Sequence, residues 1–168
     1  MLFNRTIRFK LGRLSISTLV TLTQPLEGWC SNVVGREGYH YIFMDIDDHD
    51  YDTVIEELSR IQYENQLATM FIMSDRERSY RVYCFSERTK REYLEILLDA
   101  KIVDYNFIVW VIKSNKGTLR VSRKYNRKNS ELIAVLEGYE PYTIPEKFNF
   151  AHYNTSINKL GRSIQFGR

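Results

Sequence analysis

The chain has 168 residues, of which 43% are hydrophobic and 27% charged, and its formal net charge is +3. This composition is that of an ordinary globular domain with a sizeable core, and it excludes a low-complexity chain. The two cysteines, Cys30 and Cys84, form no CxxC pair or disulfide framework, and no apolar run approaches the length of a membrane span. We therefore expect a single soluble domain over residues 1–168, in the cytoplasm and without a membrane partner.

The first part of the chain alternates between strand-like and helical patterns. Residues 1–24 are rich in Ile, Leu, Val and Thr with partial alternation, which predicts β-structure, and a loop through Pro25 and Gly28 follows. Residues 39–46 are apolar in both parities, which is typical of a well-buried strand. Residues 51–65 place apolar side chains at helical spacing and predict a helix.

The middle of the chain continues this alternation. Residues 67–74 and 79–85 predict two strands, and the short polar connection SDRERS between them favours a hairpin. Residues 86–100 predict a helix that Ser86 could cap. Each of these segments is bounded by polar residues, so the elements follow one another closely.

The last elements complete the pattern of the fold. Residues 103–113 and 118–125 predict strands joined by the turn signature SNKG, and residues 130–139 fit either a strand or a short helix. The order is then β, α, β, β, α, β, β, an α+β fold with an RRM-like or ferredoxin-like βαββαβ core and extra N-terminal strands. We expect this core at about residues 39–125. The layout serves many unrelated functions and identifies none by itself.

Acidic residues gather directly after the first buried strand. Seven carboxylates and no Lys or Arg occur from Asp45 to Glu57. Asp45 and Asp47 are two residues apart at a strand end, so their side chains leave the same face of the sheet. Two adjacent carboxylates suit a hard divalent cation such as Mg²⁺, which also removes their repulsion, and two-metal phosphoryl-transfer sites use this arrangement.

Other interpretations of these acids compete with a metal site. Asp50 and Asp52 are well placed to cap the next helix and complement its dipole, and for these two we favour that role. Asp45 and Asp47 could also be a solvated strand end. The segment matches acids of a calcium-binding loop, but Asp50 stands where that loop needs glycine and a strand precedes it instead of a helix.

Four segments in chain order resemble the motifs of archaeo-eukaryotic primases and of the primase-polymerases of plasmids and viruses: YIFMDID, SDRERSYRVYCF, KIVDYNF and TLRVSRK. The resemblance covers about residues 39–125. It implies a primase-like fold in which three carboxylates hold catalytic Mg²⁺ or Mn²⁺: Asp45, Asp47 and Asp104. It further implies that three residues bind the incoming nucleotide: Ser79, Arg81 and Arg120.

The second motif departs from the family pattern at one position. Arg81 stands where the family has a histidine that contacts the phosphates of the nucleotide. Arginine also binds phosphate, through two parallel hydrogen bonds, but it cannot exchange a proton. Substrate binding is therefore expected, and a form of the fold that no longer catalyses the reaction is an alternative.

A basic segment follows the third motif. From Lys113 to Lys128 the chain carries seven basic residues and no acid. Lys and Arg neutralise backbone phosphates, and a tyrosine stacks on unpaired bases. An exposed hairpin covered with solvated cations would give the same pattern. Arg120 of this segment is expected to bind the nucleotide, and the residues expected to contact nucleic acid are Lys113, Lys116, Arg123, Lys124, Tyr125, Arg127 and Lys128.

Together these features predict a small primase-like nucleotidyltransferase. Nucleotidyl transfer needs positioned metal ions and cations on the polyphosphate, which the predicted acids and arginines would supply. The partners of such an enzyme would be nucleoside triphosphates, a single-stranded DNA or RNA template and replication proteins. Two alternatives remain open: a replication protein of the same fold that binds nucleic acid without catalysis, and a metal-dependent nuclease.

Overall fold

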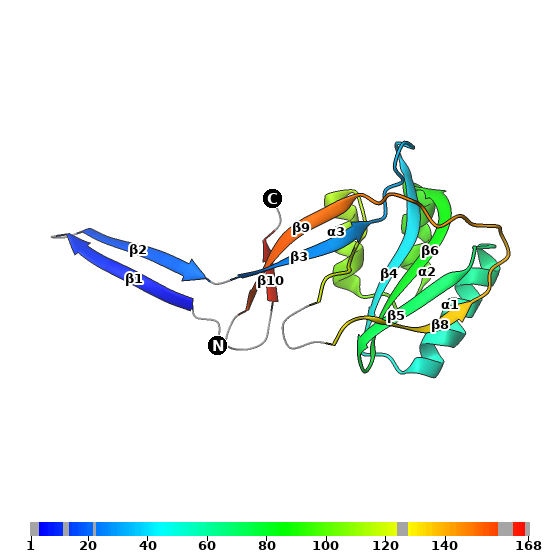
Figure 1. Cartoon of the computed structure of the whole chain (residues 1–168), viewed down its shortest axis with the longest axis horizontal. Coiled ribbons are helices and arrows are strands. Elements are labelled where there is room, and N and C mark those ends of the chain that lie inside the picture. Colours follow the sequence, from blue (N-terminus) through cyan, green and yellow to red (C-terminus); the bar gives the residue numbers. More distant parts are fainter. Residues whose placement is uncertain (1–3, 12–13, 22, 124–127, 158–162, 167–168) are drawn as a thin grey trace. The chain divides into compact units, whose positions relative to one another are not determined.

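A computed structural model of the chain describes residues 4–11, 14–21, 23–123, 128–157 and 163–166 (Figure 1). Contacts between Cα atoms divide the chain into two units: Met1–Glu27 with His152–Arg168, and Gly28–Ala151. The larger unit contains the expected core at residues 39–125. It also contains every predicted site residue that the structure describes.

The smaller unit contains antiparallel strand pairs. β1 (Asn4–Leu11) pairs with β2 (Leu14–Thr21). β9 (Phe150–Ile157), which begins in the larger unit, pairs with β10 (Ser163–Phe166). The β-structure predicted for residues 1–24 is therefore confirmed for the described part of that segment.

The predicted loop through Pro25 and Gly28 is wrong, because both residues lie inside β3 (Thr23–Cys30). Gly28 pairs with Arg120 of β7 (Thr118–Arg120). A Cβ atom at Gly28 would lie 2.9 Å from the Leu119 carbonyl oxygen, so the glycine permits a close approach of two strands. Glycine often marks a turn, but Gly28 lies within a strand and allows it to pair closely with β7.

The larger unit is built on an antiparallel sheet with the strand order β4-β6-β5-β8. Its strands are β4 (Tyr39–Asp47), β5 (Met70–Arg76), β6 (Ser79–Thr89) and β8 (Glu131–Leu136). Its helices are α1 (Tyr51–Glu64), α2 (Lys90–Asp99) and α3 (Tyr105–Ser114). The α+β class is thus confirmed, and the order β4-β6-β5 with α1 between β4 and β5 is compatible with a ferredoxin-like core.

The predictions for the second half of the core also differ in part from the structure. The strand predicted at residues 103–113 is wrong: this stretch contains most of α3, and the Asp104 carboxylate caps the helix by accepting the Asn106 N–H at 2.8 Å. The hairpin predicted through SNKG therefore does not exist, and Asn115 instead ends the helix in the left-handed conformation. The predicted helix at 86–100 begins later, at α2, because Thr89 and Glu92 form a capping box.

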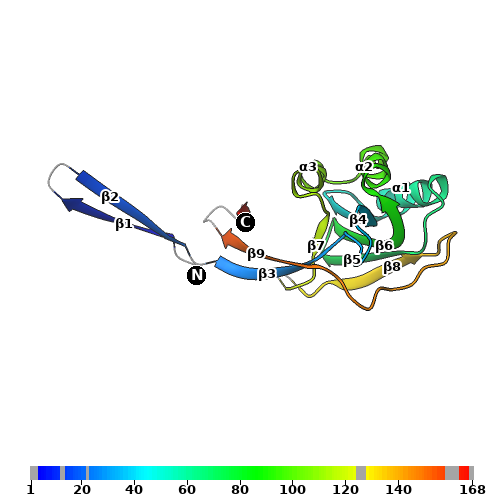
Figure 2. The ribbon, with the colours of Figure 1, turned by 90° about the horizontal axis from the view of Figure 1, so that it is seen from above.

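The helices cover one face of the sheet. Figure 2 shows α1, α2 and α3 along one side of it. Alternation along each strand points every second side chain toward these helices. These inward-facing side chains are fully buried, as are Val54, Leu58 and Ile61 of α1. The inward-facing residues of the sheet include Ile42, Met44 and Ile46 of β4, Val82 and Cys84 of β6, and Met70 and Ile72 of β5.

The opposite face of the sheet, which we call the open face, carries aromatic rings. Tyr41 and Phe43 of β4, Tyr83 and Phe85 of β6 and Phe71 of β5 form a chain of ring contacts. A segment without regular secondary structure, residues 137–149, follows β8 and leads to β9. We call this segment the strap. Figure 2 shows it on the side of the sheet away from the helices.

Candidate functional site

Charged side chains occupy the open face at the end opposite the aromatic rings. Asp45 follows Phe43 by two residues on β4, and Arg81 precedes Tyr83 by two on β6, so each charged residue shares the face of its aromatic neighbour. Asp45 and Arg81 are direct partners across the two strands. With Asp75 of β5 and Arg120 of β7 they form what we call the charged cluster.

Asp75 is the centre of the charged cluster. Its Oδ2 atom accepts Nη2 of Arg81 at 2.5 Å and Nη2 of Arg120 at 2.5 Å, and the Asp75 side chain is 3% exposed. Arg81, 7% exposed, also donates from Nη1 to the Arg120 carbonyl oxygen and to Oγ of Ser130, both at 3.2 Å. These contacts tie β5, β6, β7 and the residue before β8 together. They also occupy much of the hydrogen-bonding capacity of Arg81.

Asp75 was not among the predicted site residues, although its position in the sequence carries a signal. Asp75 follows Phe71 and Met73 at steps of two along β5, which places a carboxylate on the face that carries the rings. An acid in line with a buried strand usually needs a cationic partner. The two partners, Arg81 and Arg120, were both predicted site residues.

Asp45 differs from Asp75 because its carboxylate forms no hydrogen bond or close ion pair with any described residue. Burial, together with the negative charges of Asp47 and Asp104, raises the pKa of Asp45 from 3.8 to about 6, although the positive charges of Arg81 and Arg120 oppose the shift. A carboxylate in this setting favours either a proton or an added cation. Asp45 is therefore the acid of the site most in need of positive charge.

Asp104 lies beside Asp45, but it arrives there from a helix and not from a strand. Its backbone N–H donates to the Asp45 carbonyl oxygen at 2.9 Å. Its carboxylate accepts the backbone N–H of Asn106 at 2.8 Å and so caps α3. The first turn of α3 thus brings Asp104 to the same strand end as Asp45 and Asp47.

The three predicted metal ligands do not form a ready-made three-ligand centre. Asp47 is ion-paired with Arg76 at 2.9 Å, and Asp104 caps its helix. In the part of the chain that the structure describes, no three His, Cys, Asp or Glu side chains are close enough to hold a metal ion. Mg²⁺ commonly takes only one or two carboxylates with water and phosphate oxygens. Asp45 and Asp47 fit that smaller requirement, and the role of Asp104 as a ligand stays a prediction.

The remaining predicted residues lie around the charged cluster or outside the description. Ser79 is buried in β6 opposite Asp47, and its carbonyl oxygen accepts the Ser74 hydroxyl at 2.9 Å. Lys113 lies in the last turn of α3 and Lys116 follows it, at the opposite end of that helix from Asp104. Arg123 and Lys128 are exposed between β7 and β8. Three predicted residues lie outside the described residues: Lys124, Tyr125 and Arg127.

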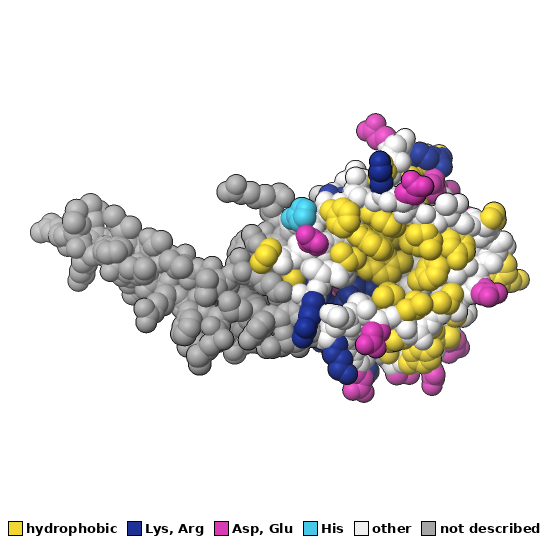
Figure 3. All heavy atoms as spheres, viewed as in Figure 1, with side chains coloured by type: hydrophobic (Ala, Val, Ile, Leu, Met, Phe, Trp, Pro, Cys, Tyr) yellow, Lys and Arg dark blue, Asp and Glu magenta, His cyan; other side chains and the backbone are white. Residues whose placement is uncertain are grey.

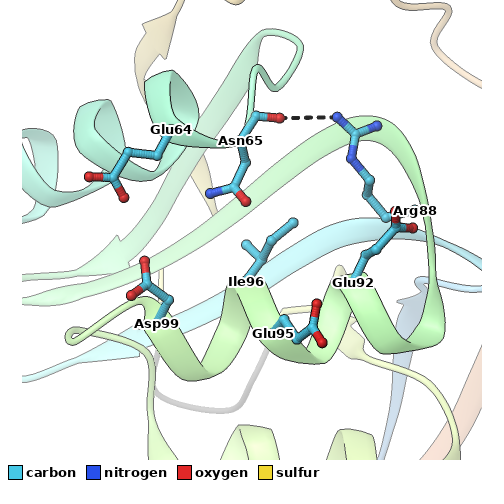
Figure 4. Close-up of a pocket in the computed structure, with 7 residues that line it drawn as sticks. All are labelled: Glu64, Asn65, Arg88, Glu92, Glu95, Ile96 and Asp99. Carbon is cyan, nitrogen blue, oxygen red and sulfur yellow. Dashed lines mark hydrogen bonds between the residues drawn. The ribbon is translucent and has the colours of Figure 1, made fainter.

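An open hollow of about 430 Å³ lies on the helix side of the molecule, and Figure 4 shows the side chains that line it. Its acids are already engaged: Arg60 pairs with Glu64 and Asp99, and Arg91 pairs with Glu95. Glu92 completes the capping box of α2. The hollow is thus a set of satisfied surface ion pairs and is not a candidate for the site. Its lining residues are Glu64, Asn65, Arg88, Glu92, Glu95, Ile96 and Asp99.

Comparison of the chain with protein-family models, with curated proteins and with solved structures finds no match. Among the described helices, none combines the length and the apolar character that crossing a membrane would require. The features that bear on function are therefore the chemistry of the charged cluster and of the face on which it lies.

Proposed function

We propose that the protein is a primase-like nucleotidyltransferase, which binds a nucleoside triphosphate with Mg²⁺ or Mn²⁺ and extends a strand on a single-stranded DNA or RNA template during replication. One observation carries the proposal: the desolvated Asp45 carboxylate, with Asp47 and Asp104 near it, faces Arg81 across the open face. Acids from β4 and from the start of α3 lie there near Arg81, which is buried, and Arg120, which is partly buried. Nucleotidyl transfer needs this combination of charges.

Each residue of the site has a distinct part in this proposal. Asp45 and Asp47 hold the cation, which supplies positive charge to the polyphosphate and to Asp45 itself. Arg120 and Arg81 bind phosphate oxygens, since guanidinium groups match phosphate geometry. Asp75 keeps both guanidinium groups at the cluster and lowers their combined charge, which prevents two neighbouring cations from repelling each other.

A second candidate function is nucleic-acid binding without catalysis. It is favoured by the state of Arg81, which is buried, hydrogen-bonded to Asp75, Ser130 and the Arg120 carbonyl oxygen, and unable to exchange a proton. In this alternative the charged cluster is a structural network of the open face. The protein would then bind a single strand in a salt-dependent manner and incorporate no nucleotide.

Incubation of the protein with a labelled primed single strand, Mn²⁺ and the four nucleotides separates these functions. Longer products support nucleotidyl transfer, shorter products indicate a nuclease, and a shifted complex alone supports the binding protein. Asp45→Ala combined with Asp47→Ala should abolish extension and leave strand binding intact or stronger, because two anions are removed. Asp48→Asn combined with Asp52→Asn removes equal charge from the same acidic segment, keeps a residue that tolerates the positive φ of position 48, and should extend normally. Unchanged extension in the first double variant would exclude the proposed site.

A further inference from the structure

The aromatic rings of the open face lie in continuity with the charged cluster. One step of two residues, about 7 Å, separates Phe43 from Asp45 on β4 and Tyr83 from Arg81 on β6. An antiparallel sheet with one face free of helices normally presents polar side chains there. This face instead presents a group of rings next to arginines, a combination that suits the bases and phosphates of a single strand.

The strap covers these rings with rings of its own. Phe148 stacks on Trp29 with ring centroids 4.3 Å apart and planes inclined by 4°. Phe148 also contacts Tyr41 at 6.2 Å and Phe85 at 5.8 Å, measured between centroids. Near the other end of the strap, Tyr142 meets Phe71 at 5.7 Å. A parallel stack on Trp29 is the contact that an unpaired base would make at the same place.

The strap is fixed at its two ends. At its start the Tyr139 N–H donates to the Leu67 carbonyl oxygen at 2.9 Å, and a Cβ atom at Gly138 would lie 2.1 Å from the Ala68 carbonyl carbon. The neighbouring Glu140 forms an ion pair with Arg88. At its end the Asn149 carbonyl oxygen accepts the Cys30 N–H at 2.8 Å.

The middle of the strap is held less firmly. From Pro141 to Phe148, no hydrogen bond joins the strap to any residue that the structure describes. Most of this stretch is exposed, and its ring contacts with described residues come from Tyr142 and Phe148. A segment with few buried contacts and no backbone hydrogen bonds opens at low free-energy cost.

We propose that the rings around Trp29 are a binding surface for unpaired bases of single-stranded nucleic acid, and that the strap occupies this surface until a strand displaces Phe148. The inference rests on the proposed function for the identity of the partner. Charge at one side of the face supports that partner: Figure 3 shows Lys and Arg side chains beside the broad group of hydrophobic side chains, with Asp and Glu side chains at other parts of its border. Arg123 and Lys128 are exposed close in sequence to Arg120 and Ser130 of the charged end.

Tryptophan fluorescence provides the test, because the chain contains only Trp29 and Trp110. Trp110→Phe leaves Trp29 as the single reporter, and titration with a short oligothymidylate should quench it as a base replaces Phe148. Phe148→Ala in this background should bind the oligonucleotide about 3- to 10-fold more tightly, since the competing ring is absent. Gly138→Ala, which disturbs the start of the strap without removing a ring, should change affinity in the same direction.

Ile144→Ala is the matched control, because Ile144 belongs to the strap but its side chain is 56% exposed. It should bind with wild-type affinity. Circular dichroism of each variant verifies folding, and the two strap variants act at different ends, so a folding defect in one leaves the other informative. The inference would be overturned if Phe148→Ala and Gly138→Ala both bind the oligonucleotide with wild-type or weaker affinity. It would also be overturned if the oligonucleotide does not change the fluorescence of Trp29.

The same variants separate this inference from the proposed function. If the protein extends a primer but Phe148→Ala leaves oligonucleotide affinity unchanged, the proposed competition between strap and strand is refuted and the proposed nucleotidyltransferase function is retained. Tighter binding in the strap variants without extension by any of the proteins would retain the strap and support the non-catalytic binding protein. Absence of oligonucleotide binding in every variant would refute both.

Discussion

The helix-covered face and the open face of the central sheet differ in what fills them. On the helix side, side chains such as Ile42, Val82 and Ile72 are completely buried and wholly apolar. On the open face the same strands carry rings at one end and the charged cluster at the other. Both faces are excluded from water over much of their area, but only the open face buries ionised groups.

This difference indicates which face stabilises the fold and which face serves function. Burial of an apolar side chain stabilises a fold without requiring a specific partner, whereas a buried charge needs a partner and adds little net stability. Asp75 has such partners, and Asp45 has none among the described residues. An unpaired, desolvated carboxylate is more often found at functional sites than at structural ones.

The largest expected effect comes from breaking the charged end of the open face. Asp75→Ala leaves Arg81 and Arg120 buried without their shared carboxylate, and removal of one partner from a buried ion pair costs about 3–5 kcal/mol. Urea denaturation measures the loss. Glu77→Ala, an exposed acid two residues away, is the control and should change stability little. A loss no larger than that of the control would show that the network is solvated and not buried.

The helix-covered face should respond strongly to loss of apolar volume. Leu58→Ala opens a cavity between α1 and the sheet and should cost about 2–5 kcal/mol. Tyr142→Ala, which trims the strap over the open face at a side chain that is 40% exposed, should cost about 1 kcal/mol or less. Equal losses in the two variants would contradict the view that the strap is held weakly.

The unpaired state of Asp45 predicts a dependence of stability on pH. Its pKa is about 6 in the folded protein against a usual 3.8, so between these values the folded state binds more protons than the unfolded state. The free energy of unfolding therefore falls as the pH rises through this range, by about 1.4 kcal/mol per pH unit and by about 3 kcal/mol in total.

Asp45→Asn should remove this decline, because the amide does not titrate. Denaturation midpoints of the wild type and the variant, compared from about pH 4 to about pH 7, provide the measurement. Asp48→Asn, at an exposed neighbour with positive φ, is the control and should keep the wild-type slope. Parallel pH profiles for Asp45→Asn and the wild type would mean that Asp45 ionises at an ordinary pH.

The smallest expected effect concerns the seating of α2 on the covered face. Thr89→Ala removes the hydroxyl of the capping box that Glu92 completes, and loss of such a cap typically costs about 1 kcal/mol. Thermal unfolding followed by circular dichroism detects a change of this size. Arg91→Ala breaks only an exposed ion pair with Glu95 and should have a smaller effect. If Arg91→Ala lowers the stability more than Thr89→Ala does, the exposed ion pair stabilises α2 more than the capping box does, contrary to this prediction.

Local sequence determined the elements whose pattern fits a single structure. Apolar side chains at helical spacing identified α1, and β5 and β6 were identified as a hairpin from two strand patterns and a short polar connection. The spacing of Asp45 and Asp47 also placed both carboxylates on one face of β4. These features depend only on the period of a strand or helix, which neighbouring residues fix by themselves.

Tertiary structure decided what local patterns leave open. The apolar run at 103–113 suits a strand and a helix alike, and docking of α3 against the end of β4, where the Asp104 N–H meets the Asp45 carbonyl oxygen, settles it as a helix. Asp75 meets Arg120 across 45 positions of the chain, and Phe148 meets Trp29 across a still longer stretch. Contacts between such distant residues arise only when the folded sheet brings them together, so no local period predicts them.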